Sequence, residues 1–199
     1  RNLDSALEFV LMKATLNVLS VLTGSLSIAL SPLASADFLS DSKANLSMRN
    51  FYFNNDNRDG IAAPSKTEEW GQAFILNYQS GFTDGTVGFG LDAIGMLGVT
   101  LDSGAGRHVG SSMIPTDDGK AADSWARGGA TAKARFAKTE LRYGYLRPNL
   151  PILVSNDGRL LPQSFEGGQI TSKDIDNLTL IGGQLQHTTG RGSSDRSGL

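Results

Sequence analysis

The stretch from Trp125 to Arg147 alternates small or apolar residues with polar ones, and it constrains the fold more than any other part of the sequence. One set of alternate positions is entirely small or apolar: Ala126, Gly128, Ala130, Ala132, Ala134 and Phe136. The positions between them are mostly polar, and include Arg127, Lys133 and Arg135. Because successive side chains of a strand point to opposite faces, the pattern predicts a β-strand with one apolar and one polar face.

After a short turn at residues 137–139 the alternation resumes. Leu141, Tyr143 and Tyr145 share one face, and Glu140, Arg142 and Gly144 share the other. A soluble sandwich would fill its apolar face with large aliphatic residues. Here that face carries Ala and Gly and ends in aromatic residues, while cations occupy the opposite face. An apolar exterior with aromatic ends and a polar interior is typical of a transmembrane β-barrel, so we predict an all-β, antiparallel barrel.

The composition agrees with a membrane role that depends on strands. The 199 residues are enough for one large domain or two small ones, and 39% of them are hydrophobic. No segment beyond residue 36 is apolar enough to be a spanning helix. The net charge of −2 argues against a nucleic-acid partner. The absence of cysteine is compatible with export without a disulfide framework.

Residues 12–36 resemble a secretory signal peptide. Lys13 supplies the positive start, residues 16–30 form the apolar run, and Ala34-Ser35-Ala36 is a cleavage site of small residues. The alternative is a membrane anchor, which would need a longer apolar run. Met12 is the natural initiator, so we expect residues 1–11 to be a non-native upstream extension.

The rest of the chain predicts further strands whose connections alternate in length. Alternating stretches predict strands near residues 44–53, 69–79, 87–93, 169–172 and 178–187. Long polar connections are expected at 54–67, 102–124 and 148–166, and short turns at 81–85, 137–139 and 173–177. Long extracellular loops and short periplasmic turns alternate in this way in outer-membrane barrels.

The alternation also predicts which side chains face lipid and which face the lumen. We expect the lipid-facing side to carry Val87, Phe89, Leu91, Leu141, Tyr143 and Tyr145. We expect the opposite side to carry Asp92 and the cations Arg49, Arg127, Lys133, Arg135 and Arg142, which are candidates for a basic lumen wall. An arginine on the lipid side at mid-membrane would cost about 2–4 kcal/mol.

The third long connection is more apolar than an exposed loop should be. Two apolar flanks, residues 150–154 and 160–162, enclose the polar tip 155–159. In a barrel the flanks would be buried against the inner wall, which would place Asp157 and Arg159 in the lumen. The alternative is a loop that folds over the rim with an ion pair at its surface.

Other motifs give no support for catalysis or for a cofactor. Gly88-x-Gly90-x-x-Ala93 matches a loose dinucleotide fingerprint, but it lies inside an alternating strand. Asn55-x-Asn57-x-Asp59-Gly60 resembles half of a calcium loop, yet Lys66 stands where the bidentate Glu should be. Neither His108 nor His187 has the spacing of a metal ligand. We therefore expect no metal, no cofactor and no enzyme activity.

Several segments together resemble the OprD family of outer-membrane porins over nearly all of residues 37–199. These segments are Asp41–Ala44, Arg49–Phe53, Glu68–Trp70, Gly81–Gly90, Asn156–Gln163, Gly167–Ser172 and Thr189–Arg191. They occur in the same order and with the same spacing as in the family.

The resemblance implies an eighteen-stranded barrel, monomeric or loosely trimeric, in the outer membrane of a Gram-negative cell. It implies a narrow channel for small carboxylate-bearing solutes, organic acids or amino acids, which pass along a ladder of basic side chains. It also implies that the third extracellular loop folds inward to form the constriction. By family position, Arg58, Asp157 and Arg159 are the expected constriction residues.

About seven strands cannot close an eighteen-stranded barrel, since two edges of unpaired backbone groups would remain. We therefore expect residues 37–199 to be the N-terminal portion of a longer barrel, from a truncated sequence or an interrupted gene. The alternative reading is a secreted soluble β-sheet protein, such as an adhesin domain. Such a protein would have to shield its apolar faces from water.

Overall fold

The structure, a computed structural model, describes residues 38–57, 65–104, 106–108 and 110–199. It is all-β, as the alternation predicted. The seven long strands are β1 (Lys43–Asp56), β2 (Lys66–Gln79), β3 (Val87–Asp102), β6 (Ser124–Phe136), β7 (Thr139–Leu146), β10 (Ser164–Ser172) and β11 (Leu180–Thr189). The short strands are β4 (Thr116–Asp117), β5 (Lys120–Ala121), β8 (Asn149–Leu150), β9 (Leu153–Val154) and β12 (Arg196–Gly198).

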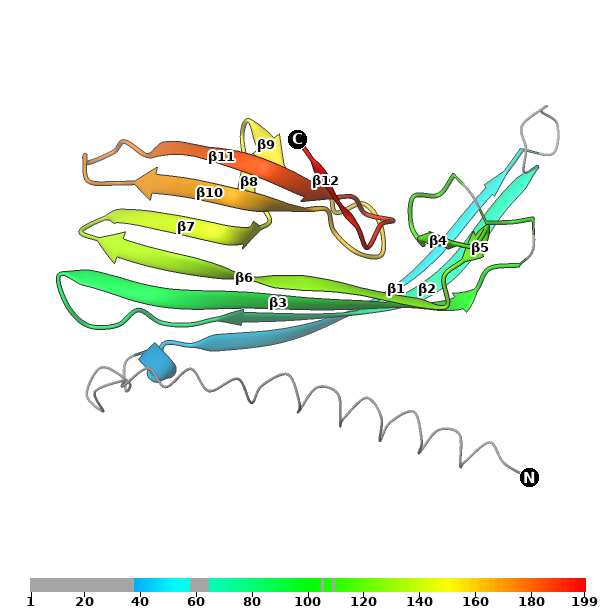
Figure 1. The fold of residues 1–199 in the computed structure, drawn as a ribbon, viewed down its shortest axis with the longest axis horizontal. Coiled ribbons are helices and arrows are strands. Elements are labelled where there is room, and N and C mark those ends of the chain that lie inside the picture. Colours follow the sequence, from blue (N-terminus) through cyan, green and yellow to red (C-terminus); the bar gives the residue numbers. More distant parts are fainter. Residues whose placement is uncertain (1–37, 58–64, 105, 109) are drawn as a thin grey trace, which may run out of the picture. The chain divides into compact units, whose positions relative to one another are not determined.

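One sheet contains all the long strands in chain order, β1-β2-β3-β6-β7-β10-β11-β12, and every neighbouring pair is antiparallel (Figure 1). Strands β1 and β12 are its two unpaired edges, so the sheet is not closed. The β4–β5 and β8–β9 pairs form separate small hairpins. Within the described ranges, no helix is long and apolar enough to cross a membrane. The expected signal peptide and Arg58 lie outside the described residues.

The short turns lie at one end of the sheet and the connections 103–123 and 147–163 at the other (Figure 1). The β6–β7 turn has only two residues, since Phe136 pairs with Thr139. Its first residue, Ala137, has a φ of 50°, because the favoured two-residue hairpin turns require positive φ. Several strands extend beyond the predicted bounds: β3 continues to Asp102, well past residue 93, and β10 begins at Ser164 instead of Gln169.

The register places the two predicted sets of side chains on opposite faces. Phe89 pairs with Ala134, and Ala132 pairs with Tyr143; these positions define the open face. Its large side chains are exposed: Phe74, Leu76, Val87, Phe89, Leu91, Leu97, Phe136, Leu141, Tyr143 and Ile170. Apolar side chains left uncovered along a whole sheet indicate contact with an apolar medium.

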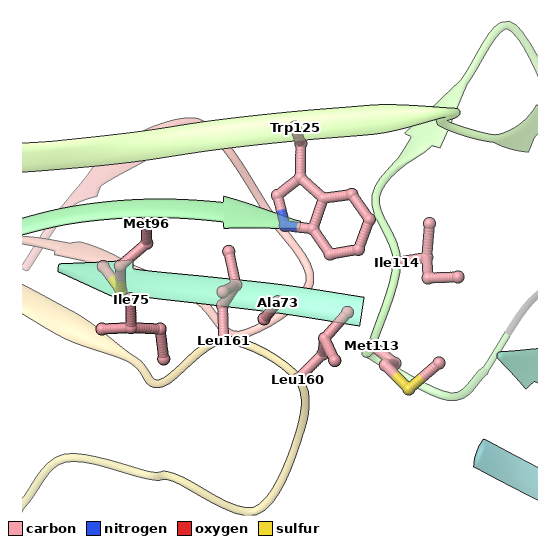
Figure 2. Close-up of a cluster of buried hydrophobic side chains, with 8 residues drawn as sticks. All are labelled: Ala73, Ile75, Met96, Met113, Ile114, Trp125, Leu160 and Leu161. Atoms are coloured by element: carbon pink, nitrogen blue, oxygen red, sulfur yellow. The ribbon is translucent and has the colours of Figure 1, made fainter. Parts of the chain in front are cut away.

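The opposite face, which we call the loop-covered face, carries the buried core. Ala73, Ile75, Met96 and Trp125 from β2, β3 and β6 are buried there. Two connections supply the side chains that cover them: Met113 and Ile114 from one, Leu160 and Leu161 from the other (Figure 2). The same face carries Arg49, which pairs with Ala73, and Lys133, which pairs with Arg142. The core therefore lies on the face that also bears the cations.

The prediction for Tyr145 was wrong, because this side chain is not on the open face with Tyr143. Tyr145 packs against the buried cluster of the loop-covered face, and its hydroxyl lies 2.6 Å from the Ser164 Oγ that donates to it. The preceding residue, Gly144, has a φ of 134°, a value that residues with a side chain rarely adopt. This irregularity breaks the two-residue period, so parity counted along β7 fails after Gly144.

Candidate functional site

The 147–163 connection packs against the loop-covered face through its second apolar flank, residues 160–162. Leu160, Leu161 and Pro162 are fully or almost fully buried. The first flank behaves differently, since Ile152 is 88% exposed and Val154 is also exposed. The expectation that both flanks would be buried was therefore only half right. The buried flank is enough to hold the polar tip, residues 155–159, beside β1.

Asp157, in the tip, forms a bidentate ion pair with Arg49 of β1. The Arg49 guanidinium donates to both carboxylate oxygens of Asp157, at 2.8 and 3.2 Å. It also donates to the backbone carbonyl of Arg159 at 2.6 Å. Paired N–H groups match the geometry of a carboxylate, and such bonds are among the stronger ones in proteins. A predicted wall cation and a predicted constriction residue are thus joined directly.

Arg159, the other tip residue, is oriented by three contacts. Its Nε donates to the backbone carbonyl of Ser111 at 2.7 Å, and its NH1 donates to that of Gly158 at 2.8 Å. Its guanidinium carbon lies 5.0 Å from the centre of the Phe53 ring, within the range of a cation–π contact. The side chain is held between the 103–123 connection and β1.

Arg127 is oriented by backbone carbonyls instead of by a carboxylate. Its NH1 donates to Gly190 O and, at 2.7 Å, to Ser193 O, and its NH2 donates to Pro162 O. The three acceptors belong to two different connections. Arg127, a predicted wall cation, therefore joins the end of the 147–163 connection to the connection between β11 and β12, residues 190–195.

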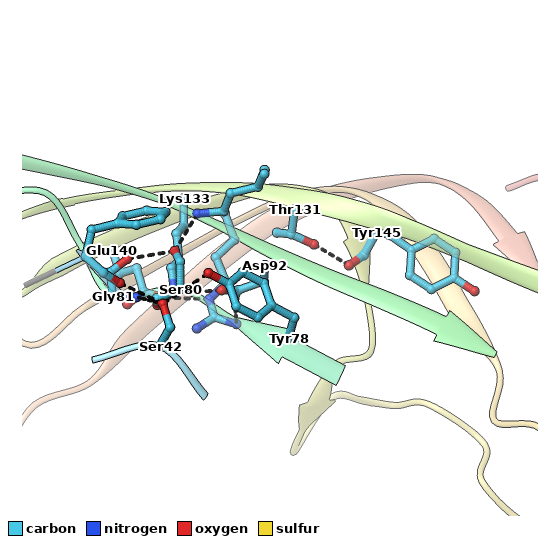
Figure 3. Close-up of polar contacts among 12 residues, drawn as sticks. Ser42, Tyr78, Ser80, Gly81, Asp92, Thr131, Lys133, Glu140 and Tyr145 are labelled. Carbon is cyan, nitrogen blue, oxygen red and sulfur yellow. Dashed lines mark hydrogen bonds and ion pairs between the residues drawn. The ribbon is translucent and has the colours of Figure 1, made fainter. Parts of the chain in front are cut away.

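Lys133, Asp92 and Arg142 form a polar network nearer the short turns (Figure 3). The Lys133 Nζ lies 2.7 Å from Asp92 Oδ1 and donates to Ser80 O at 2.8 Å. Arg142 NH1 lies 3.7 Å from the other oxygen of Asp92, and its Nε donates to Glu140. Because Lys133 is almost fully buried, water contributes little to balancing its charge, and the carboxylate of Asp92 balances it instead.

The remaining wall candidate, Arg135, stacks over the Phe82 ring with 4.3 Å between the guanidinium carbon and the ring centre. Arg135 is exposed and Arg142 is partly exposed, in contrast to Lys133. A shallow hollow beside Arg142 is lined in part by Asp92, Thr131, Tyr145 and Arg147. These exposed and half-exposed cations have room to meet a solute.

Sequence reasoning missed the part played by the 103–123 connection. It expected a polar loop, yet Met113 and Ile114 are buried in the core and Ser111 contacts Arg159. A signal was present, because Met113-Ile114 is an apolar pair inside a Gly-, Ser- and Asp-rich stretch. Among the residues that the structure describes, no group of three or more His, Asp or Glu side chains could hold a metal ion.

Comparison with known protein families identifies the family to which this chain belongs. The model of the family described as outer membrane porin, OprD family, matches residues 36–199. The chain belongs to this family. The match covers every strand of the structure, which confirms the family resemblance and makes the soluble β-sheet alternative wrong.

Individual relatives agree with this membership. Porin-like protein GalP of Pseudomonas putida is 44% identical over 155 residues, which are 77% of this chain and 37% of that protein. The crystal structure of OccK9 (OpdG) of Pseudomonas aeruginosa is similar with a TM-score of 0.77 and 49% identity, over 80% of this chain and 41% of that one. The structure of OpdK with vanillate, from the same organism, has a TM-score of 0.71 and 43% identity, over 80% and 39%.

The chain therefore spans 37% of the length of the GalP relative and 41% of that of OccK9. Its open sheet corresponds to part of a barrel of this family.

Proposed function

We propose that this segment forms part of the channel of an outer-membrane porin that passes small carboxylate-bearing solutes by diffusion. The solute is an organic acid or an amino acid, and passage requires neither cofactor nor chemical turnover. The protein acts as a monomer or a loose trimer in the lipid of the outer membrane, as the family resemblance implies. We call the segment joined to the remaining strands of its barrel the complete porin.

The observation that carries the proposal is the position of Arg49, Asp157 and Arg159. The three side chains lie at the end of the loop-covered face where the long connections fold onto the sheet. Arg142 and Arg135 follow on the same face, toward the short turns. A solute that moves along this face would meet cations from one end to the other, which suits an anion.

The relative crystallised with vanillate supports the choice of solute class, because vanillate carries a carboxylate. In the proposed channel, Arg159 meets such a group near the narrowest point, and Arg58 assists it. Arg49 and Arg142 attract the solute along the wall, and Arg127 and Arg135 add to the positive potential, whereas the buried charge of Lys133 is balanced by Asp92. Confined water lowers the effective dielectric, so these cations act more strongly than they would at an open surface.

Asp157 has a second role in the proposal. It holds the Arg49 guanidinium, and its exposed carboxylate offers a site to the ammonium group of an amino acid. A constriction that carries both signs of charge admits a zwitterion as well as a simple carboxylate. This is the reason for keeping amino acids in the solute class.

The test is to replace Arg159 by Ala in the complete porin and record reversal potentials in planar bilayers under a salt gradient. Removing one confined cation should lower the anion-to-cation permeability ratio by about five-fold, which corresponds to roughly 1 kcal/mol after screening by salt. Carboxylate uptake by cells should fall as well. The barrel should still assemble, because Leu160 and Leu161 are untouched.

Lys138→Ala is the matched control, since it removes an exposed cation from the β6–β7 turn at the other end of the sheet. It should leave the permeability ratio unchanged. An unchanged conductance and reversal potential in Arg159→Ala would remove Arg159 from the channel's constriction.

A further inference from the structure

Glu69 is a fully buried carboxylate that the proposed channel does not use. It lies near the start of β2 on the loop-covered face, opposite Phe53 in the register. Its Oε1 is 2.5 Å from His108 Nδ1, and its Oε2 accepts a hydrogen bond from the Ser111 hydroxyl. Burial of a carboxylate is costly unless both oxygens are paired, and here both are.

Both partners of Glu69 come from the 103–123 connection. His108 is itself buried, and its Nε2 lies 2.8 Å from Thr116 Oγ1. The Ser111 hydroxyl also accepts a hydrogen bond from the Met113 N–H at 2.9 Å. A single carboxylate in the sheet therefore fixes the path of this connection around Ser111.

Ser111 connects this buried cluster to the constriction. Its side chain binds Glu69, while its backbone carbonyl accepts the hydrogen bond from Arg159 Nε at 2.7 Å. The guanidinium is a rigid planar fork, so fixing the Nε–H direction fixes the directions of the other N–H groups. The position of Ser111 consequently decides where Arg159 presents its charge.

We propose that Glu69 is a positioning residue for the constriction, which acts through Ser111 to set the place of the Arg159 guanidinium and hence the anion selectivity of the channel. The inference depends on the proposed function, since it gives Arg159 a selectivity role. It adds that the 103–123 connection takes part in selectivity although it supplies no cation to the cluster of Arg49, Asp157 and Arg159.

The neighbouring carboxylate provides a matched control. Glu68 points to the other side of β2, where it pairs with Lys66 at 2.7 Å and accepts a hydrogen bond from the Tyr52 hydroxyl. It also pairs with Arg107, so it too tethers the 103–123 connection. No contact joins it to Ser111 or Arg159 in the described residues. Glu68→Gln thus weakens the same connection without touching the proposed route.

The experiment measures the anion-to-cation permeability ratio of the complete porin carrying Glu69→Gln, Ser111→Ala or Glu68→Gln, each alone and together with Arg159→Ala. Glu69→Gln and Ser111→Ala should each lower the ratio by about two- to five-fold, a typical size for an effect transmitted through one neighbour. Glu68→Gln should leave it unchanged. In the Arg159→Ala background, neither Glu69→Gln nor Ser111→Ala should change it further.

Each other outcome has a distinct meaning. If Arg159→Ala lowers the ratio while Glu69→Gln and Ser111→Ala do not, the positioning role is overturned and the proposed function stands. If Arg159→Ala is itself silent, the assignment of Arg159 fails and the inference fails with it. If Glu69→Gln has an equal effect in the Arg159→Ala background, or Glu68→Gln has the same effect, Glu69 acts on the fold in general and the inference is wrong.

Ser111→Ala keeps the test decisive if Glu69→Gln does not assemble, because it removes only one hydroxyl and leaves the carbonyl that Arg159 uses. A crystal structure of this variant of the complete porin should place Arg159 Nε beyond hydrogen-bond distance of the residue 111 carbonyl. An unmoved guanidinium would contradict the proposal.

Discussion

The two halves of the loop-covered face are built from the same strands but behave in opposite ways. Near the long connections, β3 and β6 supply Met96 and Trp125 to an apolar core that the connections cover. Toward the short turns, the same two strands supply Asp92 and Lys133 to a polar network (Figure 3). One face can therefore bury apolar side chains under loops at one end and hold a buried ion pair at the other, simply by changing residue type along each strand.

The two halves also differ in what stabilises them. The apolar half gains free energy in proportion to the area that Leu160, Leu161 and Met113 remove from water. In the polar half, the buried Lys133 is favourable only while its charge is balanced by Asp92, because an unpaired buried charge is costly. Substitutions in the two halves should therefore fail for different reasons.

The largest effect is expected from Leu160→Ala in the apolar half. Leu160 is fully buried, so the variant should lose about 3–5 kcal/mol of unfolding free energy, from lost transfer energy and the cavity left behind. Denaturant unfolding of the complete porin in detergent measures this loss. Release of the connection should also raise the single-channel conductance.

Ile152→Ala is the control for Leu160→Ala, because Ile152 belongs to the same connection but is 88% exposed. It should change the unfolding free energy by less than about 0.5 kcal/mol. Equal losses in the two variants would mean that the first flank is also buried in the complete porin.

A smaller effect is expected from Asp92→Asn in the polar half. The variant leaves Lys133 buried beside a neutral amide, and should lower the unfolding free energy by about 3 kcal/mol. Lys133→Met should cost only about 1 kcal/mol, because Asp92 keeps Arg142 NH1 at 3.7 Å as a partner. Denaturant unfolding of both variants compares the two losses. The reverse order would show that Arg142 is not a working partner of Asp92.

The smallest effect concerns the exposed β10–β11 turn, outside both halves. The Thr139 hydroxyl and the Lys138 backbone N–H donate to Asp174 and lower its pKa below the ordinary value of 3.8. The stabilisation from this lowered pKa is fully present above about pH 3.8, the ordinary pKa. It is lost as the pH falls through the lower pKa that Asp174 has in the folded protein. The difference in stability between the unsubstituted complete porin and its Asp174→Asn variant should therefore shrink as the pH falls from about 6 to about 3.

The melting temperature of the complete porin across this pH range provides the measurement. Thr139→Val removes the main donor to Asp174 and should reduce the pH dependence. If the difference in melting temperature between the unsubstituted porin and Asp174→Asn stays constant down to the lowest pH, the lowered pKa of Asp174 does not contribute to stability.

The sequence was sufficient wherever the two-residue period was unbroken. It predicted the strands, the two faces and the positions of Lys133 and Arg142 on the polar one, because side chains in a regular strand must alternate. It was wrong for Tyr145, since the backbone at Gly144 interrupts the period. For the 147–163 connection it identified the buried second flank by its apolar character, but it could not tell that Ile152 would remain exposed.

The sequence by itself determined the family, the all-β class and the cation-bearing face. Only the tertiary structure decided which partner each cation has: Asp157 for Arg49, carbonyls of two connections for Arg127, Asp92 for Lys133 and Ser111 for Arg159. The physical reason is range. Alternation is a local property of one strand, whereas these contacts join residues up to 108 positions apart, and their geometry depends on how two connections fold onto one sheet.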